Sequence, residues 1–170
     1  ALATSEELNP IPPPRDGEPL PSGTLPARRL ALLAVLAASV GRPVPRPHLI
    51  SLLWPDADPD RGERSLHQAL QALRKDLGAD VVLGAGELRL DRTLIACDLW
   101  DVDAAVQAGR LEDAADASAG PFLAGAEFPG LGELTRWVAE ERADRARVLA
   151  DVLQRLAERA GEAGDHADAI

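Results

Sequence analysis

Aromatic residues are scarce in this chain of 170 residues. They make up 3% of it, although 46% of the chain is hydrophobic, and tyrosine is absent. A core made of these residues must be aliphatic, and a composition rich in alanine and leucine favours helices over sheets. The length allows one ordinary domain or two small ones. The composition therefore predicts a mainly α protein.

Cysteine and histidine are also rare. Cys97 is the single cysteine, so it cannot form an internal disulfide, and with three scattered histidines it lacks the spacing of a metal site. His67 and Cys97 lack the third, orienting group that nucleophilic catalysis requires. We therefore expect no metal, no cofactor and no enzymatic activity.

Long hydrophobic runs are missing too. The longest, residues 30–40 with Ser39 inside it, is well short of the roughly 20 residues that a membrane helix needs. The first residues include Glu6 and Glu7 where a secretory signal would be basic. We expect a cytoplasmic protein that does not enter a membrane.

Prolines are concentrated at the start of the chain, with seven of them between residues 9 and 26. Each proline removes a backbone donor and restricts φ, so this density excludes a helix. Residues 1–24 are expected to form an extended arm or short strands.

The next part of the sequence predicts three helices and a hairpin. A helix is expected over residues 27–39, a short one from about Arg46 to before Pro55, and a long one from about residue 60 to Gly78. The stretch "VVLGAGELRL", residues 81–90, has two apolar runs around a glycine-rich turn, which indicates a hairpin. This order predicts a winged helix-turn-helix domain over residues 25–95. Trp54 is expected in its core.

Alanine-rich helical sequence follows the hairpin and predicts a second, all-helical domain over residues 96–170. Helices are expected at about 100–107, 111–119 and 131–160. Trp100 and Trp137 are expected to anchor helix packing within this domain. Gly164 and Asp165 predict a turn and the start of another helix, so we expect the chain to be a fragment of a longer protein.

The third predicted helix, around residues 60–77, has an unusual polar face. Its leucines fall on one side at about 100° per residue, and long hydrogen-bond donors fall on the other. Arginine can form hydrogen bonds to guanine and glutamine to adenine, while lysine and arginine can contact phosphate oxygens. Any amphipathic helix also exposes charge to water, but the helix-turn-helix context favours DNA. The residues that this periodicity predicts to contact DNA are Arg61, Arg64, Gln68, Gln71 and Lys75.

The charge is distributed unevenly along the chain. The whole chain has a formal net charge of −10, but residues 25–92 contain ten lysines and arginines against eight aspartates and glutamates. Residues 93–170 contain seven arginines against sixteen acidic residues. The excess of acidic residues therefore lies mainly outside the predicted DNA-binding domain. The small positive net charge of residues 25–92 predicts a modest affinity of each protein copy for DNA. Dimerisation or binding to adjacent DNA sites is expected to increase it.

Several motifs together resemble a known family. They are "LISLLWPDADPDRGERSLHQALQALRKDLGAD", "ELRLD", Cys97-Asp98-Leu99-Trp100, "GPFLAG", and Trp137 followed by "AEERADR" and "LAERAGEAGDHADAI". Over roughly residues 25–170 the chain resembles the Streptomyces antibiotic regulatory protein (SARP) type of bacterial transcriptional activator. The resemblance implies a response-regulator-like winged helix joined to an all-helical bacterial transcriptional activator domain (BTAD) related to tetratricopeptide repeats (TPR). It also implies sequence-specific binding to double-stranded DNA, often as a dimer on direct repeats, and recruitment of RNA polymerase. The resemblance places five residues where the family's recognition helix faces the groove: Arg64, Ser65, Gln68, Gln71 and Lys75. It places Arg89 and Arg92 in or just after the wing, as further predicted DNA contacts.

Two functions from different classes remain open at this point. One is a sequence-specific transcriptional regulator, expected to be an activator and possibly dimeric, whose third helix enters the major groove. The other is a protein-interaction scaffold whose winged helix no longer binds DNA, which the small positive balance permits. Salt-dependent retention on duplex DNA distinguishes them, because a scaffold should show none.

Overall fold

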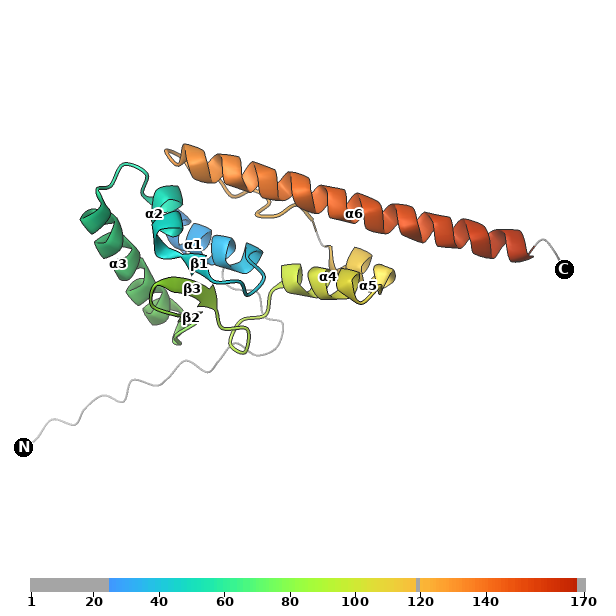
Figure 1. Cartoon of the computed structure of the whole chain (residues 1–170), viewed down its shortest axis with the longest axis horizontal. Helices are drawn as coiled ribbons and strands as arrows, with labels where there is room; N and C mark the ends of the chain where they lie inside the picture. The colour runs from blue at the N-terminus through green and yellow to red at the C-terminus, as the bar shows by residue number, and fades with distance from the viewer. Residues whose placement is uncertain (1–24, 119, 168–170) are drawn as a thin grey trace, which may run out of the picture.

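A computed structural model describes residues 25–118 and 120–167 of the chain (Figure 1). The predicted fold class is confirmed, because the described part is mainly helical and combines a winged helix with a helical segment. The arm expected over residues 1–24 lies outside the described residues.

The first helix, α1 (Ala27–Ala38), is the centre of the winged helix. It is buried nearly all round, from Ala31 to Leu36, as expected of a helix whose sequence is apolar on every side. It ends where Val40 and Gly41 both adopt positive φ angles, of 52° and 78°. The left-handed conformation is costly for helix continuation and suits glycine.

The helix-turn-helix consists of α2 (Arg46–Leu53) and α3 (Pro59–Leu77). Asp58 caps α3 by accepting a 2.9 Å hydrogen bond from the backbone N–H of Arg61. Gly78 ends the helix in the left-handed conformation with a φ of 68°. Trp54, in the turn between the helices, is half-buried against the core, so its predicted core position is confirmed.

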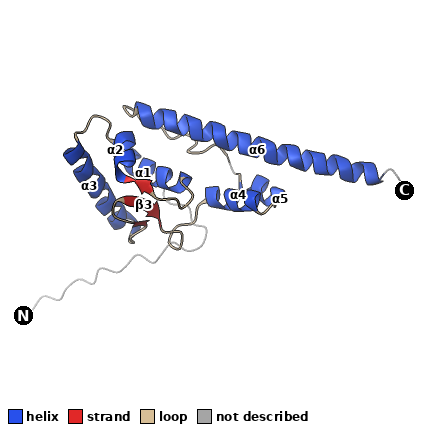
Figure 2. Ribbon diagram, viewed as in Figure 1, coloured by secondary structure: helices blue, strands red, loops and turns tan. Residues whose placement is uncertain are grey.

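The wing is a hairpin of β2 (Val82–Leu83) and β3 (Glu87–Leu90), as predicted, and β1 (Val44–Pro45) pairs with its other edge in the order β1-β3-β2 (Figure 2). Leu88 and Leu90 are buried, and the alternate residues Glu87 and Arg89 are exposed. Gly84 has a φ of 107°, and a Cβ there would lie 2.0 Å from a backbone oxygen, so the turn requires glycine. The strand β1 was not predicted, because two of the three residues 43–45 are prolines, which sheets accept only at edges.

Three more helices form the C-terminal part of the described chain: α4 (Asp98–Gln107), α5 (Leu111–Ala117) and α6 (Gly132–Ala167). Ala105, Leu111, Ala114 and Val152 form a small core where these helices meet. The turn predicted at Gly164 is wrong, since α6 continues through Gly161 and Gly164. Each glycine costs a helix about 1 kcal/mol, but the surrounding alanines and glutamates are strong helix formers and no proline interrupts them.

The largest core extends beyond the winged helix into the C-terminal part. Trp100, Phe122 and Leu134 are buried in the same cluster as the residues of α1, and the start of α6 packs along α2 (Figure 1). Trp137 is half-buried against this cluster, with its ring edge-on to Phe122. The contact of Trp137 with Phe122 agrees with the predicted packing within the helical domain, but both tryptophans also pack in the core that includes α1. They join that domain to the winged helix, because the large apolar rings cover core surface that small alanines leave open.

Candidate nucleic-acid interface

The helix α3 is held by its apolar side against α1 and α2. Leu66 and Leu73 are fully buried on that side. Gly62 is buried as well, and a Cβ at this position would lie 2.5 Å from Cγ2 of Ile50 on α2. The glycine therefore allows the two helices to approach closely at the start of α3. This packing fixes which side of α3 faces outward.

The outward side presents long donors. Successive residues of a helix turn by about 100°, so the five predicted side chains on this face lie within about 80° of one another. All five are exposed: Arg61, Arg64, Gln68, Gln71 and Lys75. Within residues 25–118 and 120–167, the side chains of Arg61, Arg64 and Lys75 form no ion pair. Ser65 is half-buried at the flank of this face. We call the five exposed residues the α3 donor face.

The arginines beside the α3 donor face form ion pairs with carboxylates. Arg46 of α2 binds Glu63 through Nε at 2.9 Å and Nη2 at 2.7 Å. Arg74 lies 3.2 Å from Asp80, which precedes the wing. Arg29 of α1 pairs with Asp76 near the end of α3. The cations of the donor face, which form no ion pair with described residues, are thus flanked by arginines whose charge is balanced by a carboxylate.

The two predicted wing residues differ in position. Arg89 is exposed on β3, opposite Leu83 of β2. Arg92 instead lies with its guanidinium carbon 4.9 Å from the centre of the Trp100 ring. A cation over an aromatic face is stabilising, so this contact holds Arg92 at the junction with α4. The structure therefore does not bring Arg92 together with the α3 donor face.

The junction also contains Asp91 and Cys97. Asp91 accepts hydrogen bonds from the hydroxyl of Thr93 at 2.6 Å and from its backbone N–H at 2.9 Å, and these bonds lower the pKa of the Asp91 carboxyl. Burial raises the pKa of the Cys97 thiol above its ordinary value. A thiol of this kind is a poor nucleophile.

Comparison with known proteins agrees with this geometry. Residues 21–85 match the family described as transcriptional regulatory protein, C terminal. Transcriptional regulatory protein EmbR of Mycobacterium bovis and that of Mycobacterium tuberculosis are each 38% identical to the chain over 121 residues. These matches support the resemblance to the SARP-type regulators.

The alignment with EmbR covers 63% of this chain and 31% of EmbR, so the chain spans about a third of the length of these curated relatives. A solved structure, Mycobacterium tuberculosis EmbR in complex with a low affinity phosphopeptide, resembles it with a TM-score of 0.51 and 29% identity. That likeness covers 81% of this chain and 40% of the EmbR chain. It therefore includes helices beyond the winged helix.

The described part of the chain offers no metal site of the usual kind, because no group of three or more histidine, cysteine or acidic side chains there could hold a metal ion. Its helices are each too short or too polar to cross a membrane. The relatives are transcriptional regulatory proteins.

Two arginines of the winged helix, Arg46 and Arg74, were not predicted from the sequence as part of the site. Arg46 and Arg74 line a groove between α3 and the wing, with His67 and Gln71. Arg74 lies between the leucine side and the donor face of α3, and Arg46 comes from another helix. Neither position is signalled by the periodicity of α3, since the groove exists only once the hairpin folds beside the helix.

Proposed function

We propose that this chain contains the DNA-binding part of a sequence-specific transcriptional activator and that α3 enters the major groove. The single observation that carries the proposal is the α3 donor face, where the side chains of Arg61, Arg64 and Lys75 are exposed and form no ion pair with any described residue. The major groove admits an α-helix, and arginine and glutamine side chains can each form paired hydrogen bonds to one base. In this arrangement Arg64 and Gln68 contact base edges, and Lys75 contacts phosphate.

The remaining predicted contacts have supporting roles. Ser65, at the flank of the face, and Arg61, near the capped start of α3, are suited to phosphate oxygens. Arg89, exposed on the wing, is suited to contact the phosphate backbone of the DNA beside α3. Arg92 was predicted as a DNA contact, but its position over Trp100 favours a structural role.

The charge distribution supports modest affinity for each copy. The small positive balance of residues 25–92 and the acidic remainder limit the nonspecific attraction to phosphate. We propose that a homodimer on repeated half-sites supplies the rest of the affinity. The winged helix covers residues 25–95 in this proposal, and residues 96–170 form a TPR-like BTAD that contacts a second copy or RNA polymerase.

The proposal places the protein in the cytoplasm, where DNA and polymerase are found, and assigns it no catalytic activity and no cofactor. The similarity to transcriptional regulators supports the proposed location and the proposed lack of catalytic activity. A hydrolytic or transfer activity of the purified chain would contradict the second.

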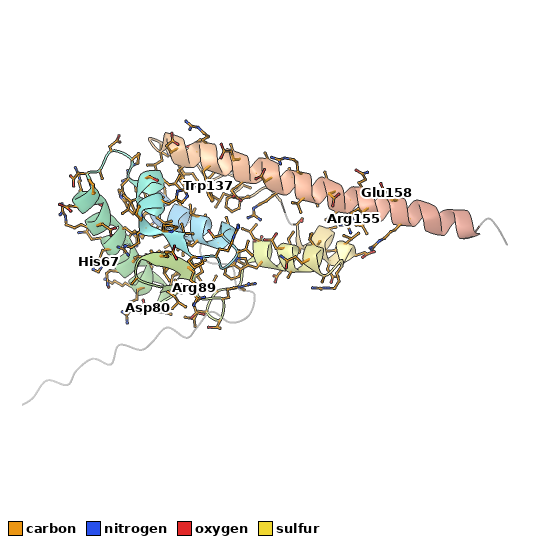
Figure 3. The ribbon with its side chains drawn as sticks, in the orientation of Figure 1. His67, Asp80, Arg89, Trp137, Arg155 and Glu158 are labelled. Carbon is orange, nitrogen blue, oxygen red and sulfur yellow. The ribbon has the colours of Figure 1, made fainter. Side chains whose placement is uncertain are left out.

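Selection of bound duplexes from a random pool, followed by affinity measurements on the selected sequence, tests the proposal. Arg64→Ala and Gln68→Ala should each lose about 1 to 3 kcal/mol of discrimination against a changed base pair. Arg155→Ala is the control, because Arg155 lies on α6 far from α3 (Figure 3). Unchanged sequence preference in both α3 variants would remove the assignment of this helix.

A protein-interaction scaffold is the second candidate. The observation in its favour is that Arg46 and Arg74, beside the donor face, are already paired with carboxylates. A scaffold should show no salt-dependent retention on any duplex, whereas a DNA-binding protein should be released as salt increases.

A further inference from the structure

A groove of about 390 Å³ separates α3 from the wing. Its floor includes the buried Leu73 and Leu88. Its edges hold side chains that donate hydrogen bonds to anions: Arg46, His67, Gln71 and Arg74. Asp80 is its one acidic lining residue in the described chain. Figure 3 shows His67 on α3 and Asp80 close to the wing, on neighbouring elements.

The geometry of duplex DNA indicates what this groove would hold. One phosphodiester strand separates the major groove from the adjacent minor groove. If α3 lies in the major groove and the wing lies over the next minor groove, that strand has to pass between α3 and the wing. This step rests on the proposed function. We propose that a phosphate of this strand displaces Asp80 from Arg74, so that the Arg74–Asp80 ion pair of the free protein has to open on DNA binding.

The two ion pairs at the groove explain why Arg74 is the exchangeable cation. Arg46 has a side chain only 19% exposed and makes two hydrogen bonds to Glu63. Arg74 and Asp80 make one contact of 3.2 Å, and their side chains are 60% and 62% exposed. An exposed pair of this kind is weak and easily replaced. Arg46 therefore remains a structural link, while Arg74 can exchange its carboxylate for a phosphate.

Asp80 has a second effect on binding, because its negative charge repels the phosphate that approaches Arg74. Replacing Asp80 by asparagine keeps the size of the side chain and removes this charge. Asp80→Asn should raise the affinity for every duplex about fivefold near 0.1 M salt. Arg74→Gln should lower affinity about equally for all sequences and reduce the slope of log K against log salt by about one.

The experiment is a double-mutant cycle on the whole chain. Fluorescence anisotropy measures binding of a selected duplex and a scrambled one at several salt concentrations, for the wild type, Asp80→Asn, Arg74→Gln and the double variant. Asp151→Asn is the matched control, because Asp151 also pairs with an arginine, Arg155 at 3.6 Å, but lies on α6. Circular dichroism of each variant confirms that its helices are intact.

The expected result is that Asp80→Asn strengthens binding more when Arg74 is present than in the Arg74→Gln background, and that Asp151→Asn has little effect. An equal gain in the Arg74→Gln background, or an equal gain from Asp151→Asn, would show a long-range effect of net charge and overturn the inference. A change of sequence preference in Arg74→Gln would also overturn it, since a phosphate contact carries no sequence information. Absence of duplex binding by the wild type would instead overturn the proposed function itself.

Discussion

The indole N–H of Trp100 donates a 2.8 Å hydrogen bond to the backbone carbonyl of Ala37. This bond joins α4 to the last turn of α1, the buried helix at the centre of the winged helix. Because α4 and α5 pack together and α5 packs on α6, the bond connects the DNA-binding domain to the whole helical segment. Four predictions follow from this junction and from the packing of α3.

Trp100→Phe should lower the free energy of unfolding by about 1 to 2 kcal/mol, since it removes the indole hydrogen bond and part of a buried ring. The Ala37 carbonyl keeps a second donor, the backbone N–H of Val40 at 3.1 Å, which limits the loss. Urea unfolding followed by circular dichroism measures the change. Trp54→Phe is the comparison, because the Trp54 indole makes no hydrogen bond to any described residue. Equal losses in the two variants would contradict a specific role for the Trp100 bond.

Arg92→Ala should mainly change stability, whereas Arg89→Ala should mainly change affinity for DNA. Arg92→Ala should lower the free energy of unfolding by about 0.5 to 1 kcal/mol by removing the cation from the Trp100 ring, with little change in affinity for DNA. Arg89→Ala should weaken binding to duplexes of any sequence and leave stability nearly unchanged, because Arg89 is exposed on the wing. Urea unfolding and anisotropy titration on the same preparations measure both effects. A loss of DNA affinity in Arg92→Ala alone would reverse this assignment.

Gly62→Ala should destabilise the protein, although alanine is the better helix former by about 1 kcal/mol. The added methyl group would lie 2.5 Å from Cγ2 of Ile50, and overpacking of this kind costs about 1 to 3 kcal/mol. Gly161→Ala is the control, since a Cβ there meets nothing within 4 Å, and it should be neutral or stabilising. Thermal and urea unfolding measure both.

The contact with Ile50 is tested by a second substitution. In an Ile50→Ala background, Gly62→Ala should cost less than it does in the wild type, because the clashing methyl group is gone. The same cost in both backgrounds would show that the close approach to Ile50 is not the cause.

Cys97 should react with iodoacetamide more slowly than free cysteine at neutral pH. Its pKa is raised above the ordinary value of 9.0, chiefly because burial disfavours the charged thiolate. The folded protein therefore disfavours loss of this proton, and the rate should rise only at pH values above those at which a free thiol is already ionised. Mass spectrometry of alkylated protein across pH measures the profile, and unfolding in urea should restore the ordinary one. A rate at neutral pH as high as that of free cysteine would contradict it.

Local sequence signals predicted most elements of the fold. Asp58 before the long helix and Gly78 after it determine where α3 begins and ends, because both act through the backbone of their own neighbours. The leucine period of the same helix placed its donors outward, and the exposure of Arg64 and Gln68 agrees with it. These features depend on residues a few positions apart, so the sequence is sufficient to find them.

The tryptophans and the continued C-terminal helix show the limits of such signals. Trp100 and Trp137 lie in alanine-rich helices, so their own surroundings suggested packing within one domain. In the structure Trp100 is hydrogen-bonded to α1, and Trp137 packs on Phe122 and against the core shared with the winged helix. At Gly164 the local signal for a turn was outweighed by the helix propensity of its neighbours.

The sequence by itself determined the helices, the hairpin turn and the polar face of α3, since caps, glycines and periodicity act over a few residues. Only the tertiary structure decided that Arg92 lies on Trp100, that Arg74 lies beside Asp80 at the edge of a groove, and that one core joins both parts of the chain. Those relations depend on how helices far apart in the chain pack together. Packing is set by the burial of all apolar surfaces at once, and no short stretch of sequence contains that information.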